Sequence, residues 1–199
     1  MSHIKSALEI ALEKSKKIDK LSPQELSRIK QQEKIDNILA KYYKDQIKLD
    51  ELWQTLKGFS NKLLVRAQNN FIQSLTFQSN DFEISKRKNG ILAIENLKEN
   101  NQVSDIEFYL EEIKKFKNEY QKNKEKIITN LKEELERDPQ KKLQTFQQGN
   151  QIMVKELSIE EVLEQNQQLK ENLNHIEKQL KNKFEQAKEK LSELTGSKG

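Results

Sequence analysis

The stretch IEEVLEQNQQLKENLNHIEKQLKNKFEQAKEKLSEL, residues 159–194, decides the fold. Its apolar residues recur at steps of about four and three, the spacing of a coiled-coil seam. Asn166 takes an a position of this seam when Val162 is counted as d. A seam this narrow is buried only by another helix, so the stretch predicts a long helix paired along its length. The candidate interaction positions on it are Asn166, Leu169, Leu173, Ile176 and Leu180.

Composition favours long, thin helices over a large globular core. Charged residues make up 34% of the 199 residues and hydrophobic residues also 34%, against roughly 25% charged and 45–50% apolar in a typical domain. Disorder fits the same balance. The regular apolar spacing, together with only two prolines and five glycines, favours helices instead.

Apolar spacing and capping signals divide the chain into two parts. Residues 1–102 are predicted to form an N-terminal helical region, with helices at about 4–18, 23–57, 59–77 and 82–100. Residues 103–199 are predicted to form a coiled-coil hairpin of helices at about 105–137 and 159–194. Capping boxes begin three of the helices, at Ser22–Glu25, Ser104–Glu107 and Ser158–Glu161.

Two segments have more than one interpretation. Asn89-Gly90 is a hairpin signal, but Ile91, Ile94 and Leu97 have helical spacing, and Asp81 offers a cap. We favour a helix over 81–100. In the connector 140–157, a polar turn separates two apolar stretches, so a short β-hairpin fits near 143–154. The expected fold class is therefore all-α: an elongated antiparallel coiled coil or helical bundle with a smaller helical subregion and room for one short hairpin.

The partner of the C-terminal seam is either helix 105–137 or a second copy of the chain. A buried asparagine at an a position favours a parallel dimer. Such a dimer would place Lys183 of one copy opposite Lys188 of the other, which is mildly unfavourable. Helices 105–137 and 159–194 are similar in length, so we favour antiparallel pairing within the chain. A homodimer through the C-terminal helix stays the alternative.

The sequence offers no pattern of catalytic or metal-binding residues. The histidines are His3 and His175, cysteine is absent, and no Gly-rich phosphate loop is found. We therefore expect no enzymatic activity, no cofactor and no metal. Residues 1–20 are too charged for a signal peptide, and no apolar run approaches the roughly 20 residues of a membrane span. These features predict a cytoplasmic protein without a membrane span.

Two local features are candidates for binding. Lys86, Arg87 and Lys88 form the densest basic patch. Three charges neutralise only about three phosphates, so we expect no strong nucleic-acid binding. Trp53 belongs to an aromatic group near the end of helix 23–57. Aromatic residues at helical spacing are usually core, but an exposed one could anchor a protein partner.

The opening residues carry a family resemblance. Ile4–Lys14, followed by Leu21-Ser22-Pro23-Gln24-Glu25-Leu26, resembles the start of an uncharacterised family of bacterial helical proteins. That family has no known activity, so the resemblance implies helices and no functional residue. The layout of the back half, with Ile152–Lys155 before the last helix, also loosely resembles a β-type prefoldin subunit. The residues upstream of 103 have no place in that second family.

Three functions follow, in order of preference. The first is a non-enzymatic coiled-coil protein that acts through protein contacts as a scaffold, adaptor or assembly factor. The second is a holdase-type chaperone, and the third is a weak nucleic-acid binder through the basic patch. The sequence identifies no partner.

Overall fold

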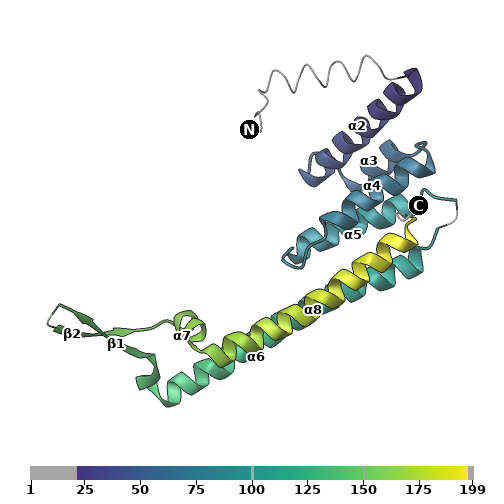
Figure 1. Cartoon of the computed structure of the whole chain (residues 1–199). Helices are drawn as coiled ribbons and strands as arrows, with labels where there is room; N and C mark the ends of the chain where they lie inside the picture. The colour runs from purple at the N-terminus through teal and green to yellow at the C-terminus, as the bar shows by residue number, and fades with distance from the viewer. Residues whose placement is uncertain (1–21, 100, 150, 197–199) are drawn as a thin grey trace, which may run out of the picture.

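A computed structural model describes residues 22–99, 101–149 and 151–196. It is all-α apart from one small antiparallel hairpin, which confirms the expected fold class. Four helices, α2 to α5, pack at one end of a long pair formed by α6 and α8, and the hairpin lies at the other end of that pair (Figure 1). The predicted helix at 4–18 lies outside the described residues.

Helices α6 (Val103–Arg137) and α8 (Gln167–Leu194) form the stalk of the molecule. They lie side by side and run in opposite directions (Figure 1). Lys183 lies 5.9 Å from the centre of the Phe116 ring, and the Tyr120 hydroxyl donates a hydrogen bond of 3.2 Å to Glu177. The apolar seam of 159–194 therefore faces 105–137 of the same chain. The N-terminal helices pack against only one end of this stalk (Figure 1).

The N-terminal helices share one hydrophobic core with the stalk. They are α2 (Pro23–Tyr43), α3 (Leu49–Leu56), α4 (Asn61–Ser74) and α5 (Asp81–Glu95). Phe71 on α4 is fully buried between the rings of Tyr42 and Tyr43. Phe77, which follows α4, packs edge-on against Phe184 of α8 at 5.6 Å. These aromatic contacts fix the N-terminal helices on one end of the stalk.

The prediction of one helix over 23–57 is wrong, because the chain turns between α2 and α3. Helix α2 ends at Tyr43, and Asp45 adopts a left-handed backbone with φ of 58°. Aspartate tolerates that conformation better than most residues. Lys48 directly precedes α3, and its N–H donates to the Glu51 carboxylate at 2.9 Å. The turn allows Leu52 and Leu56 to reach the core, where both are fully buried.

The observed helix starts can be compared with the predicted capping boxes. The boxes at Ser22–Glu25 and Ser158–Glu161 are confirmed. The box at Ser104–Glu107 is wrong, because α6 begins earlier, at Val103, without a side-chain cap. The segment at 81–100 is a helix, α5, as favoured, but its cap is Asn80 and not Asp81. None of the helices in the described ranges has the length and apolar character needed to cross a membrane.

Candidate interaction site

The hairpin at the far end of the stalk is the most exposed structured part of the molecule. A short 3-10 turn, η1 (Pro139–Lys142), leads from α6 into β1 (Leu143–Gln148), and β2 (Gln151–Glu156) returns antiparallel to it. Gly149 occupies the turn with φ of +64°, a conformation that favours glycine. All residues of both strands are exposed. The hairpin projects from the stalk, far from the main core (Figure 1).

The strand register sorts the hairpin side chains into two faces. Directly opposed residues share a face, so the pairs Phe146–Met153 and Gln144–Lys155 lie on one side. The pair Thr145–Val154 lies on the other side, which also carries Leu143 and Ile152. We call this second side the aliphatic face; its members are Leu143, Thr145, Gln147, Ile152, Val154 and Glu156.

Helix α7 lies beside the first of these faces. Helix α7 (Ile159–Gln165) reaches it through two side-chain contacts: Glu161 pairs with Lys155 at 2.5 Å, and the Gln165 amide donates to Gln144 at 3.2 Å. The exposures follow this difference. Phe146 and Met153 are 44% and 43% exposed, whereas Val154 and Ile152 on the aliphatic face are 59% and 79% exposed. At the base of the aliphatic face, Lys142 of η1 pairs with Glu156 at 3.9 Å, and Leu143, Ile152 and Val154 stay exposed.

The base of the hairpin is fixed by the backbone. The N–H of Leu157 donates to the carbonyl of Lys142 at 2.8 Å, and the Leu157 side chain is buried. Ser158 follows directly and caps α7 through Glu161. The contact of Glu161 with Lys155 lowers the pKa of Glu161 most, and the hydrogen bond from the Ser158 N–H to the Glu161 carboxylate lowers it further. These contacts connect the base of the hairpin to the start of α7.

The predicted seam residues lie inside the molecule and not on an open surface. Leu173 and Leu180 are buried, and Leu169 and Ile176 are half-buried along α8. Asn166 is different from these four. It is exposed, and it separates α7 from α8 as the N-terminal cap of α8, with its side chain accepting from the N–H of Leu169 at 3.1 Å. The prediction of one helix over 159–194 with Asn166 at a buried a position is therefore wrong.

This capping role makes a prediction. Replacing Asn166 by alanine removes the acceptor for the Leu169 N–H, and we expect the free energy of unfolding to fall by about 1 kcal/mol. Urea unfolding followed by circular dichroism measures this change. Asn172→Ala on the exposed side of α8 is the control, since alanine there only gains helix propensity. An Asn166→Ala variant as stable as the wild type would contradict the cap.

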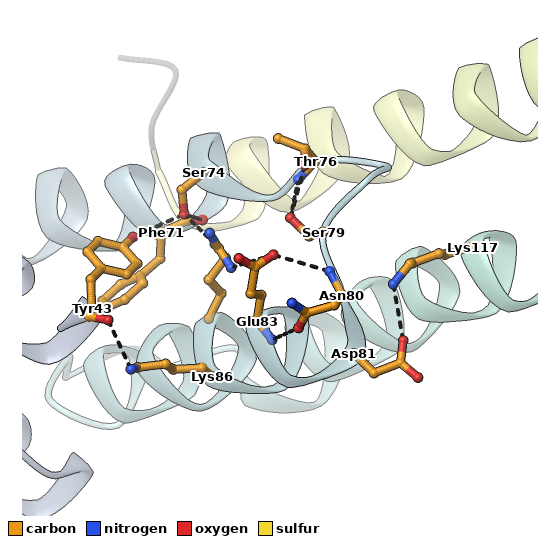
Figure 2. A network of polar contacts seen from close by, with 11 residues as sticks. Tyr43, Phe71, Ser74, Thr76, Ser79, Asn80, Asp81, Glu83, Lys86 and Lys117 are labelled. Atoms are coloured by element: carbon orange, nitrogen blue, oxygen red, sulfur yellow. Dashed lines mark hydrogen bonds and ion pairs between the residues drawn. The ribbon is translucent and has the colours of Figure 1, made fainter. Parts of the chain in front are cut away.

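The basic patch is occupied by contacts within the chain. Figure 2 shows Lys86 pointing to the end of α2, where its ammonium group donates to the Tyr43 carbonyl at 3.1 Å and pairs with Asp45. Arg87 donates to the Ser74 hydroxyl at 2.9 Å. Lys88 pairs with Glu111 at 2.6 Å, and this contact holds the pKa of Glu111 below its usual value. The patch therefore joins α5 to α2, α4 and α6.

Trp53 and the aromatic group near it belong mainly to the packing. Trp53 is half-buried, and the ammonium group of Lys57 lies 5.1 Å from the centre of its ring. Tyr42 is buried, and its hydroxyl donates to the Lys86 carbonyl at 3.0 Å. None of these rings is as exposed as Ile152 or Val154 of the hairpin. They make a weaker candidate for an anchor than the aliphatic face does.

A buried polar network lies where the N-terminal helices meet the stalk. Glu95 is 1% exposed and accepts hydrogen bonds from Lys98, Gln68 and the N–H of Gln102, each at 2.9 Å. Burial alone would raise the pKa of Glu95, but these hydrogen bonds outweigh it and hold the pKa below its usual value. Lys98 also donates to the Thr195 carbonyl. Among the described residues, no buried side-chain nitrogen or oxygen lacks a hydrogen-bond partner, and those residues hold no cluster that could bind a metal ion.

The exposed aliphatic face was not among the predicted interaction residues. The sequence located the strands near 143–154, and the run Ile152-Met153-Val154 was the available signal. Three consecutive apolar residues in a strand place apolar groups on both faces, and a stalk only two helices wide can cover one of them. The apolar spacing instead predicted interaction at Asn166 and along the seam of α8.

Comparison with known proteins gives a family and no function. No curated protein and no solved structure matches the chain. A family model does match, over residues 49–193. The match includes α3 to α7, the hairpin and nearly all of α8, and it confirms the expectation of an uncharacterised family. The residues that carried the resemblance, Ile4–Lys14 and Leu21–Leu26, precede the matched range. The chain belongs to the family of unknown function DUF6657.

Proposed function

We propose that this chain is a non-enzymatic protein that acts through protein contacts, as an adaptor, scaffold or assembly factor, with the aliphatic face of the hairpin as its contact surface. One observation carries the proposal: a hairpin held away from the core exposes Ile152 at 79% and Val154 at 59%. Large apolar side chains grouped on an exposed face commonly mark interaction sites.

Exposure of these aliphatic side chains to water is unfavourable, so a partner that covers them gains free energy. An isolated two-stranded hairpin is marginally stable, and additional strands or a packed layer stabilise it. Burying one aliphatic side chain of this size contributes roughly 1.5–3 kcal/mol. Burying Leu143, Ile152 and Val154 together therefore favours a protein contact at this face. The stalk holds this surface about 50 Å from the N-terminal end of α6, since α6 has 35 residues at about 1.5 Å each.

A cross-linking experiment tests the proposal. A photo-reactive amino acid replaces Ile152 in the full chain. This variant is expressed in cells in which the protein occurs naturally. We expect light-dependent adducts from this position, because a covered face brings a partner within bonding distance. Gln121, exposed on α6, is the matched control on the stalk and should give few or no adducts. Equal adduct yields at the two positions, or none at Ile152, would contradict the proposal.

The same exposed surface also supports a second candidate, the holdase-type chaperone. A holdase binds many unfolded chains through apolar surface, so its adducts at Ile152 would form a broad distribution of masses. An adaptor or assembly factor would give one or a few discrete adducts. We rank the adaptor first because the open surface is small, with three aliphatic residues. We also propose the cytoplasm as its compartment, which fits the absence of cysteine.

Nucleic-acid binding ranks third. The basic patch was its candidate site, and the charged groups of Lys86, Arg87 and Lys88 each contact groups of other helices. Phosphate contacts would have to compete with these interactions. We therefore make no proposal of nucleic-acid binding.

A further inference from the structure

The two edges of the hairpin differ in their protection against pairing. Proteins commonly protect an exposed strand edge with charged residues, proline or a bulge. Strand β2 carries Lys155 and Glu156, whereas β1, with the sequence LQTFQQ, has no charged residue, no proline and no glycine. Within the described residues the sheet has two strands, so the outer edge of β1 has no strand beside it. The unprotected edge is therefore the edge of β1.

We propose that β1 pairs antiparallel with β1 of a second copy of this chain, so that two hairpins form one four-stranded sheet. The proposal goes beyond the proposed function, because it concerns the edge of the hairpin and leaves the aliphatic face open to a different partner. A second copy fits this edge because β1 has no charge that would face its own like in a symmetric pair. Adding two strands also supplies what an isolated hairpin lacks for stability.

Symmetry restricts how the two copies can meet. Two antiparallel copies of one strand are related by a two-fold axis perpendicular to the sheet, so one residue lies opposite itself. With Thr145 at the axis, the two Thr145 side chains form a cross-strand pair, an arrangement that stabilises sheets. Both copies then present the aliphatic face on the same side. The outer edges become the two β2 strands, whose Lys155 and Glu156 oppose the addition of more strands.

Charge also favours contact at the tips of the two molecules. Each chain has a formal net charge of +4. Contact along the full length of two chains would therefore be opposed by electrostatic repulsion. Pairing through the hairpins leaves the N-terminal helices of the two copies at opposite ends of an elongated particle. Their separation then far exceeds the screening length of about 8–10 Å at physiological salt. The like charges of the bodies therefore do not oppose this contact.

The size of the contact predicts its strength. Each copy contributes a hairpin with two strands of six residues, which is small beside the roughly 1,200–2,000 Å² of a stable interface. We expect monomer and dimer in an equilibrium that depends on concentration. A permanent dimer would need further contacts along the stalk.

Two lysine substitutions test the proposal, measured by sedimentation equilibrium of the full chain. Thr145 and Val154 are directly opposed on the same face, so each variant adds the same charge to the aliphatic face. Thr145→Lys places the charge on the inner strand, close to its copy across the axis. Val154→Lys places it on the outer strand. We expect Thr145→Lys to lower the association constant by at least about tenfold. Val154→Lys should lower the same constant by a factor that is several-fold smaller.

The outcomes separate this inference from the proposed function. The wild-type chain should exceed its monomer mass of 23.5 kDa as concentration rises from about 1 μM to about 1 mM. A wild-type chain that stays monomeric over that range overturns self-pairing. An equal loss in both variants also overturns the β1 edge, because it indicates packing through the aliphatic face. Adducts at Ile152 with a different protein would still uphold the proposed function, whereas their absence would defeat it independently of these results.

Discussion

Replacing Glu95 by alanine is expected to lower the free energy of unfolding by about 3–5 kcal/mol, a cost typical of removing one partner from a buried ion pair. The carboxylate is 1% exposed and accepts three hydrogen bonds. Without it, the Lys98 ammonium group, whose side chain is 8% exposed, loses its buried counter-charge. Urea unfolding at neutral pH measures the loss.

The matched control is Glu99→Ala. Glu99 is exposed and lies four residues after Glu95, so its removal subtracts the same charge without opening the network. We expect the free energy of unfolding of this control to change by less than about 0.5 kcal/mol. Similar losses for the two variants would show that the network contributes little. The destabilisation caused by Glu95→Ala should also reach the end of α8, because Lys98 donates a hydrogen bond to the Thr195 carbonyl.

The stabilisation by Glu95 also depends on pH. Because folding lowers its pKa below the usual 4.5, the folded chain keeps this carboxylate ionised at a pH where the unfolded chain protonates it. The stabilisation is therefore fully present above about 4.5 and is lost as pH falls through the lowered pKa. Glu95→Gln removes this titration. The stability difference between wild type and Glu95→Gln should shrink on acidification below pH 4.5, and a constant difference would contradict the lowered pKa.

The sequence predicted the parts of the fold that depend on local pattern. The spacing of Leu173, Leu180 and Phe184 gave the buried side of α8, and serine followed by glutamate three residues later gave the starts of α2 and α7. The helix break at Asn166 was missed because its signal in the sequence is ambiguous. A capping asparagine such as Asn166 and a polar residue at a buried a position are the same letter in a sequence. Only the backbone distinguishes them.

The candidate site was less predictable than the fold. Strands near 143–154 were expected, but the exposure of Ile152 and Val154 depends on what packs beside them. Helix α7 begins after Ser158 and extends only to Gln165, so it reaches one face of the hairpin and leaves the other open. Exposure is a property of tertiary arrangement, and no spacing rule within β2 reports it.

Gly90→Val is the second large effect, and it explains why the Asn89-Gly90 hairpin signal was misleading. Gly90 lies buried within α5, and a Cβ atom there would come within 2.7 Å of Cζ of Phe71 and 2.9 Å of its Cε2. The glycine permits close approach of α5 to α4 and makes no turn. Phe71 cannot move aside easily, because the Tyr42 and Tyr43 rings pack against it at 5.6 and 5.1 Å. We expect a loss of about 3 kcal/mol in the free energy of unfolding, the upper part of the usual range for overpacking.

Two further variants separate this packing effect from helix propensity. In a helix interior, most residues are favoured over glycine by up to about 1 kcal/mol, so Gly90→Val should stabilise the protein if propensity prevailed. Asn89→Val, at the exposed neighbouring position, should change stability by less than about 0.5 kcal/mol. Phe71→Leu shortens the opposing side chain, so the double variant should lose at least about 1 kcal/mol less than the sum of the two single losses. Strict additivity would mean that Gly90 and Phe71 are not in contact, and the close approach of α4 and α5 would then be wrong.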